Sequence, residues 1–122
     1  MSSGTEAFLQ TLDRLGEALA APESAISRDA AIQRFEFCFE LAWRVIQEHA
    51  RDEGLDCRSP KGCVKLAFKT GWVDSEIDWL AMLEDRNRTS HTYNEALARD
   101  VFSRLAVHLS SFRRLVSTLA AD

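Results

Sequence analysis

The stretch Phe35-Glu36-Phe37-Cys38-Phe39-Glu40-Leu41-Ala42-Trp43 forms the middle of a long segment with helical periodicity. Apolar side chains recur there every three or four residues and form one stripe: Ile32, Phe35, Phe39, Ala42 and Ile46. Phe37 and Trp43 lie off this stripe, so the helix is apolar on more than one face. Such a helix is buried on more than one face, either as the central helix of a bundle or at an interface between subunits.

Two helices are predicted in the first half of the chain. Ser3-Gly4-Thr5-Glu6 fits a capping box and opens a helix that continues to about Ala20. Ser27 is the expected cap of the central helix, which ends near Gly54 because glycine suits the positive φ that follows a helix.

Three more helices are predicted after the central one. Ser59-Pro60 is a strong start signal for a helix that carries Val64, Ala67 and Phe68 on its apolar side and stops at Gly71. Asp74 opens the next helix, which weakens in a polar run near residue 89. Asn94 caps a single last helix whose apolar positions continue to Leu119.

Length and composition favour one all-α domain. The chain has 122 residues, 46% of them hydrophobic, with only five glycines and two prolines. These values predict a single domain over residues 1–122, folded as an up-and-down, antiparallel bundle of about five helices. The net charge of −4 is unlike that of a nucleic-acid coat protein, although a local basic patch can still contact RNA.

Composition also argues against several other classes. The three cysteines, Cys38, Cys57 and Cys63, are an odd number without a secretory leader, so we expect plain thiols rather than a disulfide framework. Their spacing does not match a zinc site, and neither a metal nor a cofactor is expected. No segment approaches the length of about 18 apolar residues that spans a membrane, so we expect a cytoplasmic protein.

One segment is dense in chemically active side chains: Arg86-Asn87-Arg88-Thr89-Ser90-His91-Thr92-Tyr93. An arginine offers a fixed fork of donors for phosphate, and a histidine exchanges a proton near neutral pH. Together they suit metal-free cleavage of RNA, with His91 moving a proton and Arg86 neutralising charge on phosphorus. The structural alternative is a solvated helix end in which Arg86 pairs with a carboxylate.

Helical geometry limits how this segment can work. Positions five apart, such as Arg86 and His91, lie about 140° apart around an ideal helix, whereas Asn87 and His91 share a face. Arg86 and His91 therefore converge only if the helix distorts or ends near Thr89, or if a second copy of the chain completes the site. We accordingly interpret the segment as a half-site.

Other polar residues are weaker candidates. Lys61, Lys65 and Lys69 are four apart and line one helix face, which is either a strip of backbone contacts to RNA or simply a solvated surface. His49 lies near a helix end, where a cation suits the dipole. His108 falls beside the last apolar stripe and is expected at its boundary.

The sequence also resembles a known family. Arg, four residues, His, one residue, Tyr is the motif of HEPN-domain toxins. The blocks Phe35–Trp43, Ser59-Pro60, Ala67–Gly71 and Arg86–Glu95, in this order, resemble the nucleotidyltransferase substrate-binding proteins over about residues 5–120. The resemblance implies a five-helix fold that forms a homodimer, and a minimal nucleotidyltransferase partner encoded nearby.

Members of that family were first interpreted as substrate-binding halves of split nucleotidyltransferases, and later members behave as toxin–antitoxin pairs. In such pairs this subunit is a ribonuclease, and the partner silences it by adenylylating the motif tyrosine. The resemblance thus implies that Arg86 and His91 are catalytic, that Asn87 assists, and that Tyr93 is modified. Arg88 replaces a residue that is more often apolar in relatives, and is either a second phosphate contact or an exposed charge.

Overall fold

The computed structural model describes residues 3–121, and for Ser3 the backbone alone. The expected capping role of the Ser3 side chain therefore lies outside the described residues. The chain is all-helical over this part, as predicted, and its elements are α1 (Ser3–Ala20), α2 (Ala25–Asp52), α3 (Pro60–Thr70), α4 (Glu76–Arg88), the 3-10 turn η1 (Thr89–His91), α5 (Glu95–Phe102) and α6 (Leu105–Ala121).

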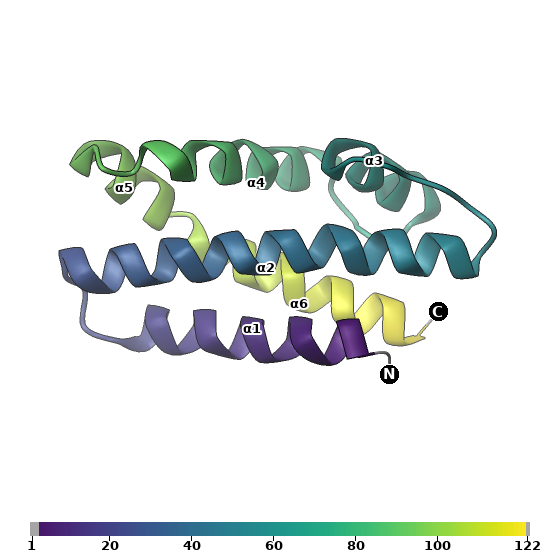
Figure 1. Cartoon of the computed structure of the whole chain (residues 1–122), viewed down its shortest axis with the longest axis horizontal. Helices are drawn as coiled ribbons and strands as arrows, with labels where there is room; N and C mark the ends of the chain where they lie inside the picture. Colours follow the sequence, from purple (N-terminus) through teal and green to yellow (C-terminus); the bar gives the residue numbers. More distant parts are fainter. Residues whose placement is uncertain (1–2, 122) are drawn as a thin grey trace.

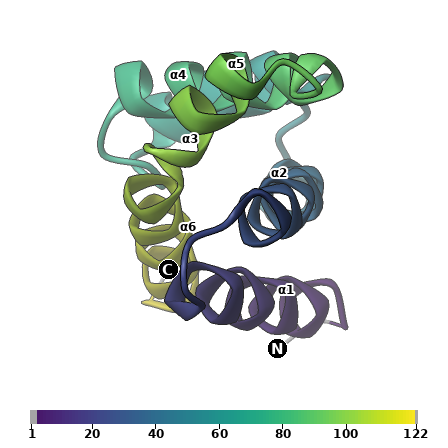
Figure 2. The same ribbon diagram turned by 90° about the vertical axis from the view of Figure 1, so that its left-hand side faces the viewer.

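Helix α2 is the axis around which the others are arranged. Figure 1 shows it running the length of the molecule, with α1 on one side and the layer of α3, α4 and α5 on the other. The view along α2 shows α6 closing a third side, while no described helix covers the fourth (Figure 2). Of the two roles predicted for α2, the central helix of a bundle is confirmed, and the interface between subunits stays a prediction.

The core lies on the stripe predicted for α2. Ile32, Phe35, Phe39, Ala42 and Ile46 are all buried. Aromatic rings from three other helices meet beside them, because Phe112 of α6 packs edge-on against Phe8 and Trp79, with ring centroids 5.8 and 5.7 Å apart. Edge-on packing of this kind adds to the apolar area that such rings already bury.

Two helix starts differ from the prediction by a few residues. The N-cap of α2 is Ser24, whose hydroxyl accepts from the Ser27 backbone N–H at 3.0 Å, while Ser27 returns a bond to the Ser24 N–H. Ser27 is therefore the third residue of a capping box rather than the cap. Helix α4 is capped by Ser75 in place of Asp74, with the Ser75 hydroxyl accepting from Asp78.

The predicted single last helix is two helices. Asn94 caps α5 as expected, accepting from the Leu97 N–H at 3.1 Å. The chain then leaves the helix at Ser103, whose hydroxyl donates to the Asp100 carbonyl at 2.6 Å, and α6 starts at Leu105. A serine hydroxyl that bonds to the backbone in this way competes with the helical pattern.

The other predicted boundaries are confirmed. Ser59 caps α3, with Pro60 in its first turn, and Gly71 ends it at φ +85°. Gly54 follows α2 at φ +76°. Both glycines lie in the left-handed region, where a side chain is disfavoured, so each glycine fixes the place where its helix stops.

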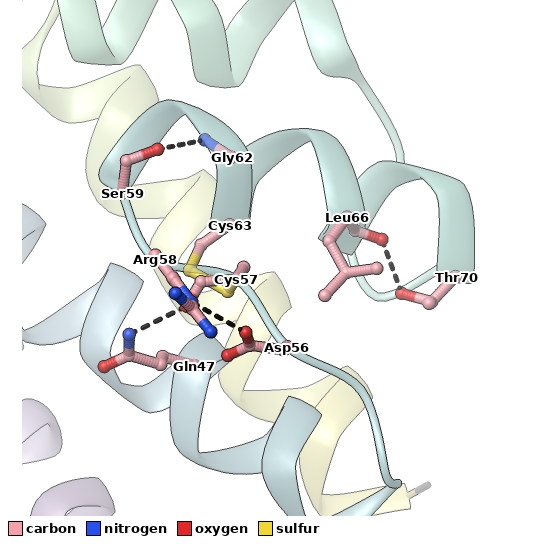
Figure 3. Close-up of a disulfide and its surroundings, with 9 residues drawn as sticks. All are labelled: Gln47, Asp56, Cys57, Arg58, Ser59, Gly62, Cys63, Leu66 and Thr70. Carbon is pink, nitrogen blue, oxygen red and sulfur yellow. Dashed lines mark hydrogen bonds and ion pairs between the residues drawn. A yellow bond between two sulfur atoms is a disulfide. The ribbon is translucent and has the colours of Figure 1, made fainter.

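The expectation of plain thiols was wrong for two of the three cysteines. Cys57 and Cys63 form a disulfide between the loop after α2 and the first turn of α3 (Figure 3). Gln47 of α2 donates to the Cys57 carbonyl at 2.8 Å and holds the same loop from the other side. Cys38 is a free thiol in the core, where burial raises its pKa to about 12. Within the described residues, no helix is both long and apolar enough to cross a membrane.

Candidate functional site

The polar segment lies where α4 ends and the chain turns towards α5, at one end of the bundle (Figure 1). Helix α4 stops at Arg88, and Thr89–His91 continue as a 3-10 turn. Hydroxyl groups cause the change: Thr89 donates to the Arg86 carbonyl at 2.6 Å, and Thr92 donates to the Thr89 carbonyl at 2.9 Å. The predicted break near Thr89 is therefore confirmed.

Arg86 faces α2 from the last turn of α4. Its guanidinium lies 3.3 Å from the Glu40 carboxylate and 6.0 Å from the centre of the Phe39 ring. It also donates to the Asn87 side-chain oxygen at 3.4 Å. The arginine is thus held by a carboxylate, as the structural alternative expected, yet remains partly open to solvent.

Glu40 is the carboxylate that positions Arg86. Partial burial opposes its ionisation, but hydrogen bonds from Trp43 and Arg44 outweigh that effect and lower its pKa. Because Glu40 is charged at neutral pH, it holds the Arg86 fork in place and competes with an incoming phosphate for it.

His91 and Tyr93 form the second half of the segment. Both are exposed, Tyr93 to 86% of its surface, and their rings meet edge-on with centroids 6.2 Å apart. Among the described residues, no hydrogen bond joins His91 to Arg86. The structure therefore links Arg86 with Asn87 and His91 with Tyr93, as two separate pairs.

A buried carboxylate that the sequence did not single out lies directly behind the site. Asp85 is fully buried and accepts from Arg104 at 2.7 and 2.8 Å, from Arg88 at 3.1 Å, and makes a 2.7 Å hydrogen bond with His108. Burial alone would raise its pKa, but the bonds from Arg104 and His108 prevail and hold the pKa well below its usual range. Asp85 thus ties the end of α4 to α6.

This cluster, Asp85 with Arg88, Arg104 and His108, corrects one expectation. His108 is buried rather than at a boundary, and its ring stacks on Phe35 with centroids 5.3 Å apart. Arg88 is half-exposed and pairs with Asp85 at 3.1 Å and with Glu84 at 3.8 Å, so its role as a phosphate contact or an exposed charge stays a prediction. The sequence signal for the cluster was a histidine four residues after an arginine at the start of α6.

The remaining candidates lie elsewhere. Lys61, Lys65 and Lys69 are exposed on α3, at the end of the molecule opposite η1 (Figure 1). A shallow hollow of about 420 Å³ does lie next to the motif, lined by α2 residues from Asp29 to Phe37 and by Thr92. Among the described residues, no group of three or more His, Cys, Asp and Glu side chains is arranged to hold a metal ion.

Comparison with known proteins agrees with this architecture. A crystal structure of a Thermus thermophilus protein superposes with a TM-score of 0.87 at 39% identity, covering 92% of this chain and 98% of the other. A Haemophilus influenzae protein, described as revealing the fold of a substrate binding domain of a nucleotidyltransferase, superposes with a TM-score of 0.72 at 23% identity, covering 97% and 95%. The second likeness shows the fold alone.

Two comparisons of sequence add to these structures. A Haemophilus influenzae protein named as a probable ribonuclease HepT is 28% identical over 80 residues, which cover 62% of this chain. The chain spans about half, 55%, of that relative's length. The family model described as nucleotidyltransferase substrate binding protein like matches residues 4–121. The chain therefore belongs to the nucleotidyltransferase substrate binding protein-like family.

Proposed function

We propose that this chain is the helical subunit of a two-component minimal nucleotidyltransferase system, and that it is itself a metal-independent ribonuclease. The observation that carries the proposal is the end of α4, where the helix breaks and presents His91 on an exposed turn close in sequence to a partly open Arg86. The family model and the relative named as a probable ribonuclease support both parts.

The reaction that these residues suit is internal transfer at phosphorus. The 2′-hydroxyl oxygen of RNA bonds to the adjacent phosphorus, and the bond from phosphorus to the 5′ oxygen of the next nucleotide breaks. His91 accepts the 2′-hydroxyl proton or protonates the leaving oxygen. Arg86 neutralises the charge that builds on the phosphoryl oxygens, and Asn87, which already bonds to it, orients its fork.

Tyr93 is the proposed point of control. Its ring touches His91 and its surface is almost fully accessible, so a second protein can reach the phenol without unfolding the chain. The partner would transfer AMP to it: the tyrosine oxygen bonds to the α-phosphorus of ATP, pyrophosphate leaves, and the phenol loses its proton. The added phosphate places negative charge beside His91 and obstructs an RNA backbone there. Because RNA and ATP are the proposed substrates of the two proteins, we propose that both act in the cytoplasm.

A second copy of the chain is the proposed means of completing the site. Ile26 and Phe37 lie eleven residues apart on the uncovered side of α2, about 20° apart around the helix, and are 82% and 45% exposed. Exposed apolar side chains along one helix favour association of subunits. Phe37 also lines the hollow beside Thr92, so a homodimer through this face would bring a second subunit next to the motif.

A non-catalytic role remains the second candidate, and one observation favours it. In the single chain, Glu40 occupies the fork of Arg86 and no hydrogen bond joins the arginine to His91. A subunit that only presents substrate to a nucleotidyltransferase needs no such link. The two candidates differ in whether the purified protein cuts RNA.

The test is cleavage of a mixed RNA by the purified protein in excess chelator. The proposal predicts cleavage by the wild type, and a loss of about 10²-fold or more for Arg86→Ala. Arg14→Ala, an exposed arginine of α1 that pairs with Glu17, is the matched control and keeps full activity. Equal cleavage by wild type and Arg86→Ala would favour the non-catalytic role.

The control by the partner has its own test. The protein is incubated with the nucleotidyltransferase encoded nearby and ATP, and the mass of each peptide is measured. We expect one AMP on the peptide that contains Tyr93, and none in Tyr93→Phe. An adduct that persists in Tyr93→Phe contradicts the proposed site of modification.

A further inference from the structure

Every lysine of the chain lies on α3. The sequence has three, Lys61, Lys65 and Lys69, and all three are exposed. Successive members are four residues apart, so they rise about 6 Å along the axis and turn by about 40° at each step. They therefore form one narrow, gently curving row on the outside of the helix.

Among the described residues, these lysines differ from most of the arginines in making no ion pair. Most arginines pair with a carboxylate, as Arg28 does with Glu23 and Glu95. Within residues 3–121, no ion pair involves a lysine. Helix α3 itself contains no acidic residue. In a chain of net charge −4, this row is a local concentration of uncompensated positive charge.

Phe68 lies beside this row, although its sequence position predicted a core residue. Val64 and Ala67 are buried as expected, whereas Phe68 is 45% exposed. On an ideal helix, Phe68 and the three lysines fall within an arc of about 100°. The result is a row of three ammonium groups with one half-exposed aromatic ring at its edge, which we call the α3 face: Lys61, Lys65, Phe68 and Lys69.

We propose that the α3 face is a binding site for single-stranded RNA, in which the lysines contact successive phosphates and one base stacks on Phe68. A positively charged row that follows the backbone, combined with aromatic rings that accept any base, is how proteins bind single strands without sequence preference. This inference rests on the proposed ribonuclease function and names its substrate class: single-stranded RNA long enough to extend beyond the cleavage site.

The exposed Phe68 ring favours RNA, rather than an acidic protein, as the ligand of the α3 face. An acidic polypeptide needs only the lysines, whereas a nucleic acid also gains from a flat apolar surface among them.

The position of the α3 face sets the length of strand required. It is separated from the motif by the 13 residues of α4, or about 20 Å of helix. A dinucleotide cannot reach both, whereas a strand of several nucleotides can. The disulfide from Cys63 to Cys57 fixes the first turn of α3 to the preceding loop and so holds the row in a constant direction (Figure 3).

The experiment measures binding without cleavage. The His91→Ala protein is titrated against a fluorescent single-stranded RNA of about 12 nucleotides, at several salt concentrations, and against an abasic strand of equal length. We expect RNA to bind about tenfold more tightly than the abasic strand. The logarithm of the binding constant falls with the logarithm of the salt concentration. This dependence should become less steep by about 2 when Lys61, Lys65 and Lys69 are changed to Gln.

The ring is tested separately. Phe68→Leu should remove the preference for RNA over the abasic strand and leave the salt slope unchanged. The matched controls are Arg14→Gln for charge and Val107→Ala for an exposed apolar side chain, and neither should alter binding. Circular dichroism checks that each variant is folded.

Three outcomes overturn the inference. The first is unchanged RNA affinity and salt slope in the triple Lys→Gln variant. The second is equal binding of RNA, abasic strand and polyglutamate, which identifies a general site for polyanions or an acidic protein. The third is a change of oligomeric state in the triple variant, which identifies a contact between copies. All three are independent of the cleavage assay, so the ribonuclease proposal can fail or stand separately.

Discussion

Replacing Asp85 with asparagine should destabilise the protein more than any other single polar change near the site. The carboxylate is fully buried and faces Arg104, Arg88 and His108. Asparagine has the same shape but no charge, and its amide N–H groups meet the N–H groups of Arg104. Breaking a buried ion pair by removing one partner costs about 3–5 kcal/mol.

The lower end of that range applies here. In the variant, Arg104 keeps its hydrogen bonds to Asp100 at 3.0 Å and has access to solvent. Its charge is therefore not left buried without a partner. A loss of about 3 kcal/mol is therefore expected. For 122 residues at about 2.1 cal/mol/K each, this loss lowers the melting temperature by about 12 °C.

Unfolding in urea at several pH values is the assay. The pKa of Asp85 is depressed in the folded state, so between the folded and unfolded pKa values the unfolded chain binds more protons. The stabilisation is fully present above the ordinary Asp pKa of about 3.9 and is lost as pH falls through the lower folded pKa. The difference in free energy of unfolding between wild type and Asp85→Asn should thus be constant from pH 5 to 8 and disappear only in acid.

The matched control is Asp100→Asn. This exposed carboxylate pairs with the same Arg104 from the solvent side. Its replacement should therefore lower the free energy of unfolding much less than the replacement of Asp85 does. The reasoning is refuted if Asp85→Asn unfolds within about 0.5 kcal/mol of wild type at pH 7, or if both variants lose the same amount.

Three further predictions test the fold. Thiol titration should find no reactive cysteine in the native protein, one after denaturation without reductant and three after reduction. The reason is that Cys38 is buried with a raised pKa, while Cys57 and Cys63 are joined by a disulfide. Three thiols in unreduced, denatured protein would disprove the disulfide. Ser24→Ala should cost about 1 kcal/mol in urea unfolding, and an unchanged midpoint would reject the assigned cap of α2. Gly71→Ala should cost about 1 kcal/mol from backbone strain alone, because a Cβ there meets no atom within 4 Å; a neutral result would contradict the positive φ.

The sequence was sufficient for the features that depend on neighbours along the chain. The stripe on α2, the cap at Ser59 and the stop at Gly71 each follow from local spacing or conformational preference, and the structure confirms them. Ser24 was missed because both members of its capping box are serines, and only the backbone shows which of them precedes the helix.

Features that depend on distant residues could not be predicted. The spacing of Cys57 and Cys63 does not reveal whether the loop bends enough to join them. Asp85 lies in a polar run and is buried only because α6 brings Arg104 and His108 to it. In the site, the break at Thr89 was predictable from its hydroxyl groups, whereas the capture of Arg86 by Glu40 required the packing of α4 on α2.

The central claim is that His91 carries a proton during RNA cleavage. Its most direct test is the effect of removing the imidazole on the rate of cleavage. Single-turnover cleavage of the same RNA is measured for wild type and His91→Ala, in excess chelator and with the folding of each confirmed. The account predicts a rate about 10²–10⁴-fold lower in the variant, as expected when a general acid or base is removed. Cleavage by His91→Ala at the wild-type rate would contradict it.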